Sequence, residues 1–208
     1  AEQSILCLEA FHNAGVEAPR AVDMCTGSGA IACAIGRHAP WSRVLAVDIS
    51  QDALKYARAN IDALQVADCV TAVAGDLFDG LPAEWLGVHV IASNPPYIPT
   101  QVMAGLQREI SQHEPAIALD GGADGLAYYR RLAAEAGEVL CAGGRMLVEV
   151  GAGQADEVCS ILSQHAWCAI HITSDYSGTP RVVAASPALS GLRHGRDGSG
   201  DGEGRERS

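Results

Sequence analysis

Four consecutive residues, Asn94-Pro95-Pro96-Tyr97, place a carboxamide, two prolines and a phenol directly after an apolar run of the chain. The two prolines each fix φ and keep Asn94 extended, so we expect this segment to form a stiff arch. The Asn94 side-chain oxygen and the Pro95 carbonyl can each accept one N–H hydrogen bond. An amide or exocyclic amino nitrogen held in this way would pyramidalise and present its lone pair to an electrophile, while Tyr97 stacks on the planar group.

A sulfonium methyl group is an electrophile that suits this arch, because a sulfonium is an excellent leaving group and needs no strong base or metal. Positioning and electrostatics would then supply most of the acceleration. The alternative is a simple turn with an aromatic anchor, since Asn-Pro turns are common. The place of the motif, after a predicted buried strand and downstream of a glycine-rich loop, favours the catalytic interpretation.

A glycine-rich loop, residues 23–29 (DMCTGSG), follows the first predicted strand and opens a helix. Its glycines allow a tight turn and a close approach of a ligand to the main chain, and the helix N-terminus supplies free N–H groups. The loop also matches the dinucleotide fingerprint G-x-G-x-x-A. On its own it leaves open a nicotinamide cofactor and S-adenosylmethionine. The predicted cofactor-site residues of this loop are Cys25, Thr26, Gly27, Ser28 and Gly29.

Acidic residues lie at or near the carboxyl ends of the first three predicted strands. Asp48 ends the second strand roughly 20 residues past the loop, where a carboxylate can accept both hydroxyls of a ribose. Ile49 and Asn94 are predicted to join it at the cofactor site. Two further carboxylates favour S-adenosylmethionine. We expect Asp23 to reach its positively charged methionyl portion through water or backbone, and Asp76 to meet its adenine amino group. Leu77 and Phe78 could cover the adenine face.

Alternating β and α patterns must position these residues. Short runs rich in Val, Ile and Ala predict buried strands, near 21–25, 43–48, 70–75, 88–93, 145–150, 169–174 and 181–186. Helical spacing of apolar residues predicts helices over 3–14, 51–64, 125–141 and 154–164, and Ser50 is a natural N-cap for the second of these.

Strand–helix alternation over this length implies an α/β fold, a doubly wound sheet with helices on both faces. The last two strands are joined by DYSGTP, which is too short for a parallel crossover, so they should form an antiparallel hairpin. A seven-stranded Rossmann-like sheet that ends in such a hairpin is the layout expected of an S-adenosylmethionine-dependent methyltransferase.

Composition limits the function further. The chain has 208 residues and a net charge of -11, which argues against direct binding of nucleic acid through phosphates. No apolar run reaches the ~20 residues of a membrane span, and the first residues lack the basic segment of a signal peptide. The seven cysteines show neither a CxxC pair nor a metal-ligand spacing, which suits a reducing compartment. We expect a cytoplasmic monomer without a metal site.

The chain divides into two parts by composition. Residues 1–190 carry the alternating pattern and are predicted to form one catalytic domain. Residues 191–208 are rich in glycine and poor in apolar side chains, so this tail is predicted to be disordered.

The sequence resembles the HemK/PrmC family of protein-glutamine N5-methyltransferases. Four stretches carry the likeness: DMCTGSGAIACAI, IASNPPYI, HEPAIALDGGADGLAYYRRL and the closing EVGAGQ…SDYSGTPRVV. The resemblance implies that the substrate is the glutamine of the Gly-Gly-Gln loop in peptide chain release factors. The cofactor would be S-adenosylmethionine, leaving as S-adenosylhomocysteine, and the product N5-methylglutamine.

The resemblance also assigns roles to residues. Asn94 through Tyr97 would hold the glutamine amide, and Cys25 through Gly29, Asp48 and Leu77 would line the cofactor site. The family usually has an N-terminal helical domain that helps to dock the release factor, whereas this chain starts about one helix before its first predicted strand. We expect Glu114, after the arch, to be a carboxylate that packs a loop rather than a catalytic base.

Three alternatives remain open from the sequence. One is a ribosomal-protein glutamine methyltransferase. The second is a nucleic-acid amino-group methyltransferase acting on adenine N6 or guanine N2, which shares the arch but should show a basic surface. The third is a nicotinamide-dependent oxidoreductase or a non-catalytic nucleotide-binding protein, which explains the glycine-rich loop but gives the arch no function.

Overall fold

The computed structural model describes residues 1–103, 105 and 115–188. Glu114 and the predicted tail, residues 191–208, lie outside the described residues. In the described part, no helix has the length and hydropathy needed to cross a membrane.

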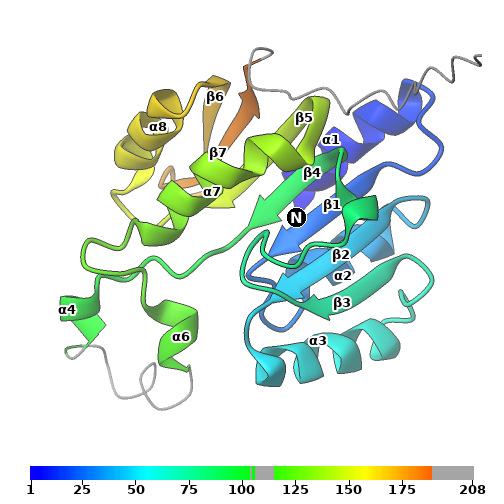
Figure 1. Cartoon of the computed structure of the whole chain (residues 1–208), viewed down its shortest axis with the longest axis horizontal. Helices are drawn as coiled ribbons and strands as arrows, with labels where there is room; N and C mark the ends of the chain where they lie inside the picture. Colours follow the sequence, from blue (N-terminus) through cyan, green and yellow to red (C-terminus); the bar gives the residue numbers. More distant parts are fainter. Residues whose placement is uncertain (104, 106–114, 189–208) are drawn as a thin grey trace, which may run out of the picture.

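One mixed sheet organises the described residues (Figure 1). Its strands are β1 (Arg20–Met24), β2 (Arg43–Asp48), β3 (Val70–Ala74), β4 (Val88–Ser93), β5 (Leu140–Glu149), β6 (Trp167–Ser174) and β7 (Pro180–Pro187). They lie in the order β3-β2-β1-β4-β5-β7-β6. Strands β1 to β5 pair in parallel, whereas β7 runs antiparallel to both β5 and β6. The predicted fold class is therefore confirmed, including the closing hairpin.

Helices cover both faces of this sheet. They are α1 (Glu2–Asn13), α2 (Ala30–His38), α3 (Gln51–Ala63), α7 (Ala127–Val139) and α8 (Ala155–Gln164). Because side chains alternate along a strand, Val44 and Ala46 of β2 pack in the cluster that includes α1, α2 and α3, whereas Leu45 and Val47 pack in the cluster that includes α7 and α8. Both faces are thus apolar, as the continuous hydrophobic runs predict.

The strand register brings the functional segments to one edge. Met24 of β1 pairs with Val47 of β2 and with Ser93 of β4. Because these strands are parallel and end level with one another, the glycine-rich loop, Asp48 and the arch emerge side by side. Ser50 caps α3 as predicted, since its hydroxyl accepts the Ala53 N–H at 3.2 Å.

One predicted boundary is wrong. The helix predicted over 125–141 ends at Val139, and β5 begins at Leu140 rather than near residue 145. The pairing with β4 shifts between Leu140 and Arg145, which marks a bulge. Gly143 in this bulge has φ +79, a left-handed conformation that glycine adopts readily. Leu140 is buried in either arrangement, so its apolar character fits the end of a helix and the start of a strand equally well.

The segment between β4 and α7 contains elements that the periodicity did not predict. These are α4 (Thr100–Met103) and α6 (Ala116–Leu119). A further element that was not predicted, the 3-10 turn η1 (Ala83–Trp85), lies before β4. Figure 1 shows α4 and α6 beyond the carboxyl ends of the central strands. This position places α6 next to the edge where the functional segments emerge.

Candidate active site

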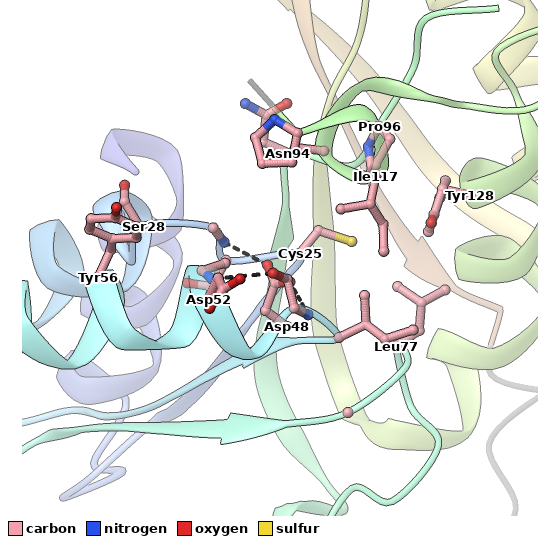
Figure 2. A pocket seen from close by; sticks show the side chains of 18 of the residues that line it. Cys25, Ser28, Asp48, Asp52, Tyr56, Leu77, Asn94, Pro96, Ile117 and Tyr128 are labelled. Atoms are coloured by element: carbon pink, nitrogen blue, oxygen red, sulfur yellow. Dashed lines mark hydrogen bonds between the residues drawn. The ribbon is translucent and has the colours of Figure 1, made fainter. Parts of the chain in front are cut away.

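A cavity of about 420 Å³ opens at this edge of the sheet, within the range of ~300–1,000 Å³ typical of small-molecule sites. Figure 2 shows Asn94 and Pro96 above the cavity, Asp48 and Leu77 below it, and Tyr128 at its side. The predicted residues that line it are Cys25, Thr26, Gly27, Ser28, Asp48, Ile49, Asp76, Leu77, Asn94 and Pro96. The structure therefore brings most of the predicted site together.

Asp48 joins two segments of the cavity wall. Its Oδ2 accepts the Gly27 N–H at 2.8 Å and its Oδ1 accepts the Ser50 N–H at 2.8 Å, as the dashed lines in Figure 2 show. Each carboxylate oxygen can still accept another hydrogen bond. Asp48 thus fixes the loop after β1 relative to the end of β2 and keeps capacity for two hydroxyl donors.

Asp23 does not line the cavity, and its predicted approach to the methionyl portion of the cofactor through water or backbone stays a prediction. Its side chain is fully buried, and its Oδ2 accepts the Thr26 hydroxyl at 2.5 Å and the Ala32 N–H at 3.0 Å. Its Oδ1 has no hydrogen-bond partner within the described residues. Burial raises the pKa of Asp23 to about 6, against donation from Thr26 and Ala32 that lowers it. Asp23 therefore braces the loop from behind.

The raised pKa of Asp23 makes its contribution to stability depend on pH. A carboxyl whose folded pKa of about 6 exceeds its ordinary 3.8 stabilises the fold while protonated, and this contribution is lost as the pH rises through 6. We compare the unfolding free energy of Asp23→Asn with that of wild type at pH 4.5 and at pH 7.5. We expect the difference to shift in favour of the variant by about 2 kcal/mol from the lower to the higher pH, because only the wild type carries the ionisable group. Urea titrations at both pH values measure this, and a pH-independent difference would contradict it.

Cys25 and Gly29 occupy different places in the loop. Cys25 has φ +56 and lines the cavity. Burial, followed by the nearby Asp48 carboxylate, raises the pKa of its thiol to about 12, so the thiol stays protonated and is a poor nucleophile. Gly29 lies directly before α2 with φ +80, and an added Cβ would lie 3.3 Å from Ala57 Cα. Gly29 therefore faces α3 instead of the cavity and permits close packing there.

The opposite wall holds Asp76 and Leu77. The Asp76 Oδ1 lies 2.7 Å from Arg131 Nη1, in an ion pair that the sequence did not predict. Leu77 is buried with φ +53 and lines the cavity. Phe78 instead packs against the hydrophobic core and is not among the lining residues. The ion pair connects α7 to this wall.

Several lining residues were not predicted. They are Ala30, Ile31, Ser50, Asp52, Ala53, Tyr56, Gly75, Pro115, Ile117, Ala118 and Tyr128. Pro115, Ile117 and Ala118 come from α6 or the residue before it, a segment without a periodic pattern. Tyr128 lies in the stretch HEPAIALDGGADGLAYYRRL, and burial raises the pKa of its phenol, which therefore stays protonated. Its neighbour Tyr129 is buried and donates to the Glu149 carbonyl at 2.9 Å.

The four residues of the arch, Asn94 to Tyr97, differ in their exposure to solvent. Asn94 is exposed, Pro95 and Pro96 are buried, and Asn94 and Pro96 line the cavity. Tyr97 is half-buried and does not line it; a Cβ added to Gly151 would lie 2.9 Å from Tyr97 Cδ2. The predicted stacking of Tyr97 on a substrate group stays a prediction.

A second layer of backbone holds the far end of the arch. The Ile98 N–H donates to the Leu119 carbonyl at 2.9 Å, and the Ile98 carbonyl accepts the Gly121 N–H at 2.8 Å. The loop continues to Gly125, which has φ +77 and lies so close to the arch that an added Cβ would be 2.4 Å from the Tyr97 carbonyl oxygen. This loop and the arch are therefore packed backbone against backbone.

We expect Gly125→Ala to destabilise the protein by about 2 kcal/mol more than Gly153→Ala. Both glycines have positive φ, but an added Cβ at Gly153 meets nothing within 4 Å. The control therefore carries the same kind of backbone strain, about 1 kcal/mol, without the clash against Tyr97. Thermal and denaturant unfolding of the two variants measure the difference. Equal destabilisation would show that the contact with the arch is looser than described.

Comparisons with known proteins match most of the chain. The family model of the methyltransferase small domain matches residues 2–123. A release factor glutamine methyltransferase from Thermodesulfovibrio yellowstonii is 38% identical over 171 residues, 82% of this chain and 60% of that protein. One from Gloeobacter violaceus is 41% identical over 165 residues, 79% of this chain and 57% of that protein. The chain thus spans somewhat more than half the length of these curated relatives.

Solved structures share the fold at low sequence identity. The catalytic domain of human METTL16 in complex with a 3′UTR hairpin gives a TM-score of 0.65 at 16% identity, over 88% of this chain and 68% of that one. A methyltransferase from Pyrococcus furiosus gives a TM-score of 0.60 at 16% identity, over 87% and 81%. Both are Rossmann-like methyltransferases, in agreement with the sheet order described above.

Proposed function

The chain belongs to the methyltransferase small domain family, and from this premise we propose that it transfers a methyl group from S-adenosylmethionine to the side-chain amide nitrogen of a glutamine in a peptide chain release factor. The observation that carries the proposal is the position of Asn94, at the mouth of a cavity whose wall carries Asp48 and Asp76. This arrangement supports a site in which the arch would hold an acceptor amide beside a bound cationic cofactor.

The charge of the cavity supports S-adenosylmethionine over a nicotinamide dinucleotide. The lining includes Asp48, Asp52 and Asp76, and within the described residues it includes no Lys or Arg. Two backbone N–H groups near the start of α2, those of Gly27 and Ala32, already donate to carboxylates. A cationic sulfonium with an ammonium group suits this environment, whereas a pyrophosphate would meet negative charge and few free donors.

The residues that line the cavity suit the ribose, the methionyl portion and the adenine of S-adenosylmethionine. Asp48 would accept the two ribose hydroxyls, and residues 25–28 would bring their backbone close to the methionyl portion. Ile49, Leu77 and Tyr128 would enclose the adenine, and Asp76, held by Arg131, would accept its amino group. Asp23 would act indirectly, by keeping the loop in shape. When bound, S-adenosylmethionine supplies an electrophilic methyl group carried on sulfur.

The arch would prepare the acceptor nitrogen. The Asn94 Oδ1 and the Pro95 carbonyl oxygen would each accept one N–H of the glutamine amide, turning its lone pair toward the methyl group. The nitrogen would bond to the methyl carbon as the C–S bond breaks, and it would then release one proton to water. Pro95 and Pro96 would keep the arch rigid, and Tyr97 would contact the planar amide.

The release factor is favoured as the substrate by the names of the relatives, which are 36–41% identical to this chain. A net charge of -11 speaks against a surface that binds nucleic acid. Ribosomal protein and nucleic acid remain acceptors that the same experiment tests. We also propose that residues 1–190 form the catalytic domain, and that the protein acts as a monomer in the cytoplasm.

Transfer of a labelled methyl group tests this function. The protein is incubated with labelled S-adenosylmethionine and a release factor, and the Gly-Gly-Gln peptide is analysed by mass spectrometry. We expect one added methyl group on the glutamine, and none on a release factor in which glutamate replaces that glutamine. Ribosomal protein, DNA and RNA are offered in parallel. Transfer to one of these but not to the release factor would contradict the proposed substrate.

A further inference from the structure

Gln154 lies directly before α8, at the residue where a side chain ordinarily caps a helix. Ser, Thr, Asp and Asn at this position accept a backbone N–H of the first turn. Gln154 makes no such cap hydrogen bond. Its side chain turns away from its own helix, and its Oε1 accepts the Gly151 N–H at 3.1 Å.

The amide nitrogen of Gln154 reaches the arch. Gln154 Nε2 donates to the Tyr97 carbonyl oxygen at 3.0 Å, and it lies 3.5 Å from the Gly125 carbonyl oxygen. One half-buried side chain thus connects the turn after β5, the loop before α7 and the last residue of the arch. These three segments are far apart in the sequence.

Two glycines leave room for this connection. A Cβ added to Gly151 would lie 2.5 Å from Gln154 Oε1, and one added to Gly125 would lie 2.8 Å from Gln154 Nε2. Both distances are too short for real Cβ contacts. The backbone on both sides of Gln154 is therefore packed around its carboxamide, which restricts the orientation that the carboxamide can take.

We propose that Gln154 is a positioning residue for methyl transfer, which fixes the orientation of the arch through the Tyr97 carbonyl. This inference rests on the proposed function. The near end of the arch is held by β4, where the Ser93 hydroxyl donates to the Met24 carbonyl at 2.9 Å. At the far end, Gln154 supplies a directional side-chain hydrogen bond to Tyr97, close to the Asn94 and Pro95 oxygens that would hold the acceptor.

Two substitutions test this role. Gln154→Ser removes the reach to Tyr97. Because Gln154 makes no cap hydrogen bond to α8 in the wild type, the substitution costs that helix no cap, and stability should stay near that of wild type. Gln154→Glu keeps the length of the side chain but, when ionised, has no N–H or O–H to donate. The matched control is Gln164→Glu, on the exposed last turn of the same helix.

We expect Gln154→Ser to lower kcat about 10- to 100-fold, since small displacements of reacting groups cost this much. Its Kd for S-adenosylmethionine should stay within about twofold of wild type and its Tm within about 2 °C. We expect the kcat of Gln154→Glu, divided by that of wild type at the same pH, to rise as the pH falls from 8 to 5.5, because a protonated carboxyl regains a donor. The ratio for Gln164→Glu should stay constant.

Three results would overturn the inference: wild-type kcat in Gln154→Ser or, at pH 8, in Gln154→Glu; a pH-independent ratio for Gln154→Glu; or a loss of Tm and cofactor affinity that accounts for the loss of kcat. Circular dichroism at each pH confirms that the variants are folded during the assay. Failure of the proposed function is a separate outcome, because the wild-type protein itself would then transfer no methyl group to the release factor.

Discussion

Asn94→Ala should lower kcat for methyl transfer by about 10³-fold and leave the Kd for S-adenosylmethionine within about threefold of wild type. The Asn94 side chain is exposed at the mouth of the cavity, where it would meet the acceptor amide and not the buried parts of the cofactor. Removal of its oxygen leaves the acceptor nitrogen planar and weakly nucleophilic. Pro95 and Pro96 still shape the arch, so the fold should be unaffected.

The test separates chemistry from binding. Single-turnover rates at saturating cofactor give the loss in the methyl-transfer step, and isothermal titration gives the Kd. The matched control is Asn13→Ala, at the exposed last residue of α1, which should retain full activity. Equal losses of turnover and cofactor affinity in Asn94→Ala would place Asn94 in the cofactor site and remove its role in orienting the acceptor.

Most of the fold is predictable, because the strands are apolar on both faces and the apolar residues of the helices recur at helical spacing. The strand runs at 43–48 and 88–93 match β2 and β4 as observed. The boundary between α7 and β5 is not predictable from periodicity, because Leu140 is buried in both possible elements. A bulge with Gly143 at positive φ decides it, and bulges arise from pairing with a neighbouring strand rather than from local pattern.

The residues of the candidate site also divide into those that the sequence predicts and those that it does not. Asp48 and Asn94 are predictable because Asp48 ends one strand and Asn94 directly follows another, and the carboxyl ends of both strands must lie at the ligand-binding edge. Strand alternation also indicates which face of the sheet Asp23 takes. Val22 and Met24 pack in the cluster that includes α7, so Asp23 faces α2, where its Oδ2 accepts the Ala32 N–H.

The parts of the site that the sequence does not predict depend on tertiary packing. The α6 helix is four residues long and carries no periodic pattern. Tyr128 and Tyr129 are adjacent in the same helix, and only the docking of α7 on the sheet decides which faces the cavity and which enters the core. Gln154 looks like an ordinary helix-start residue until the arch and the turn at Gly151 are folded around it.

Asp48→Ala should raise the Kd for S-adenosylmethionine about 100-fold, or about 3 kcal/mol. The change removes the proposed acceptors for the ribose hydroxyls. It also leaves the Gly27 and Ser50 N–H groups without their acceptor, so the cavity wall would lose its contacts with the ribose and the hydrogen bonds that fix its conformation.

At saturating cofactor, kcat should fall much less than affinity, because β4 and the loop around Gly121 hold the arch independently of Asp48. Asp62→Ala, on the exposed face of α3, is the matched control and should bind normally. An unchanged Kd in Asp48→Ala would mean that the ribose lies elsewhere, whereas an equal fall in kcat would mean that the loop after β1 also sets the position of the arch. Measured together, the Asp48 and Asn94 variants therefore decide whether cofactor binding and acceptor orientation are separate properties of two neighbouring strand ends.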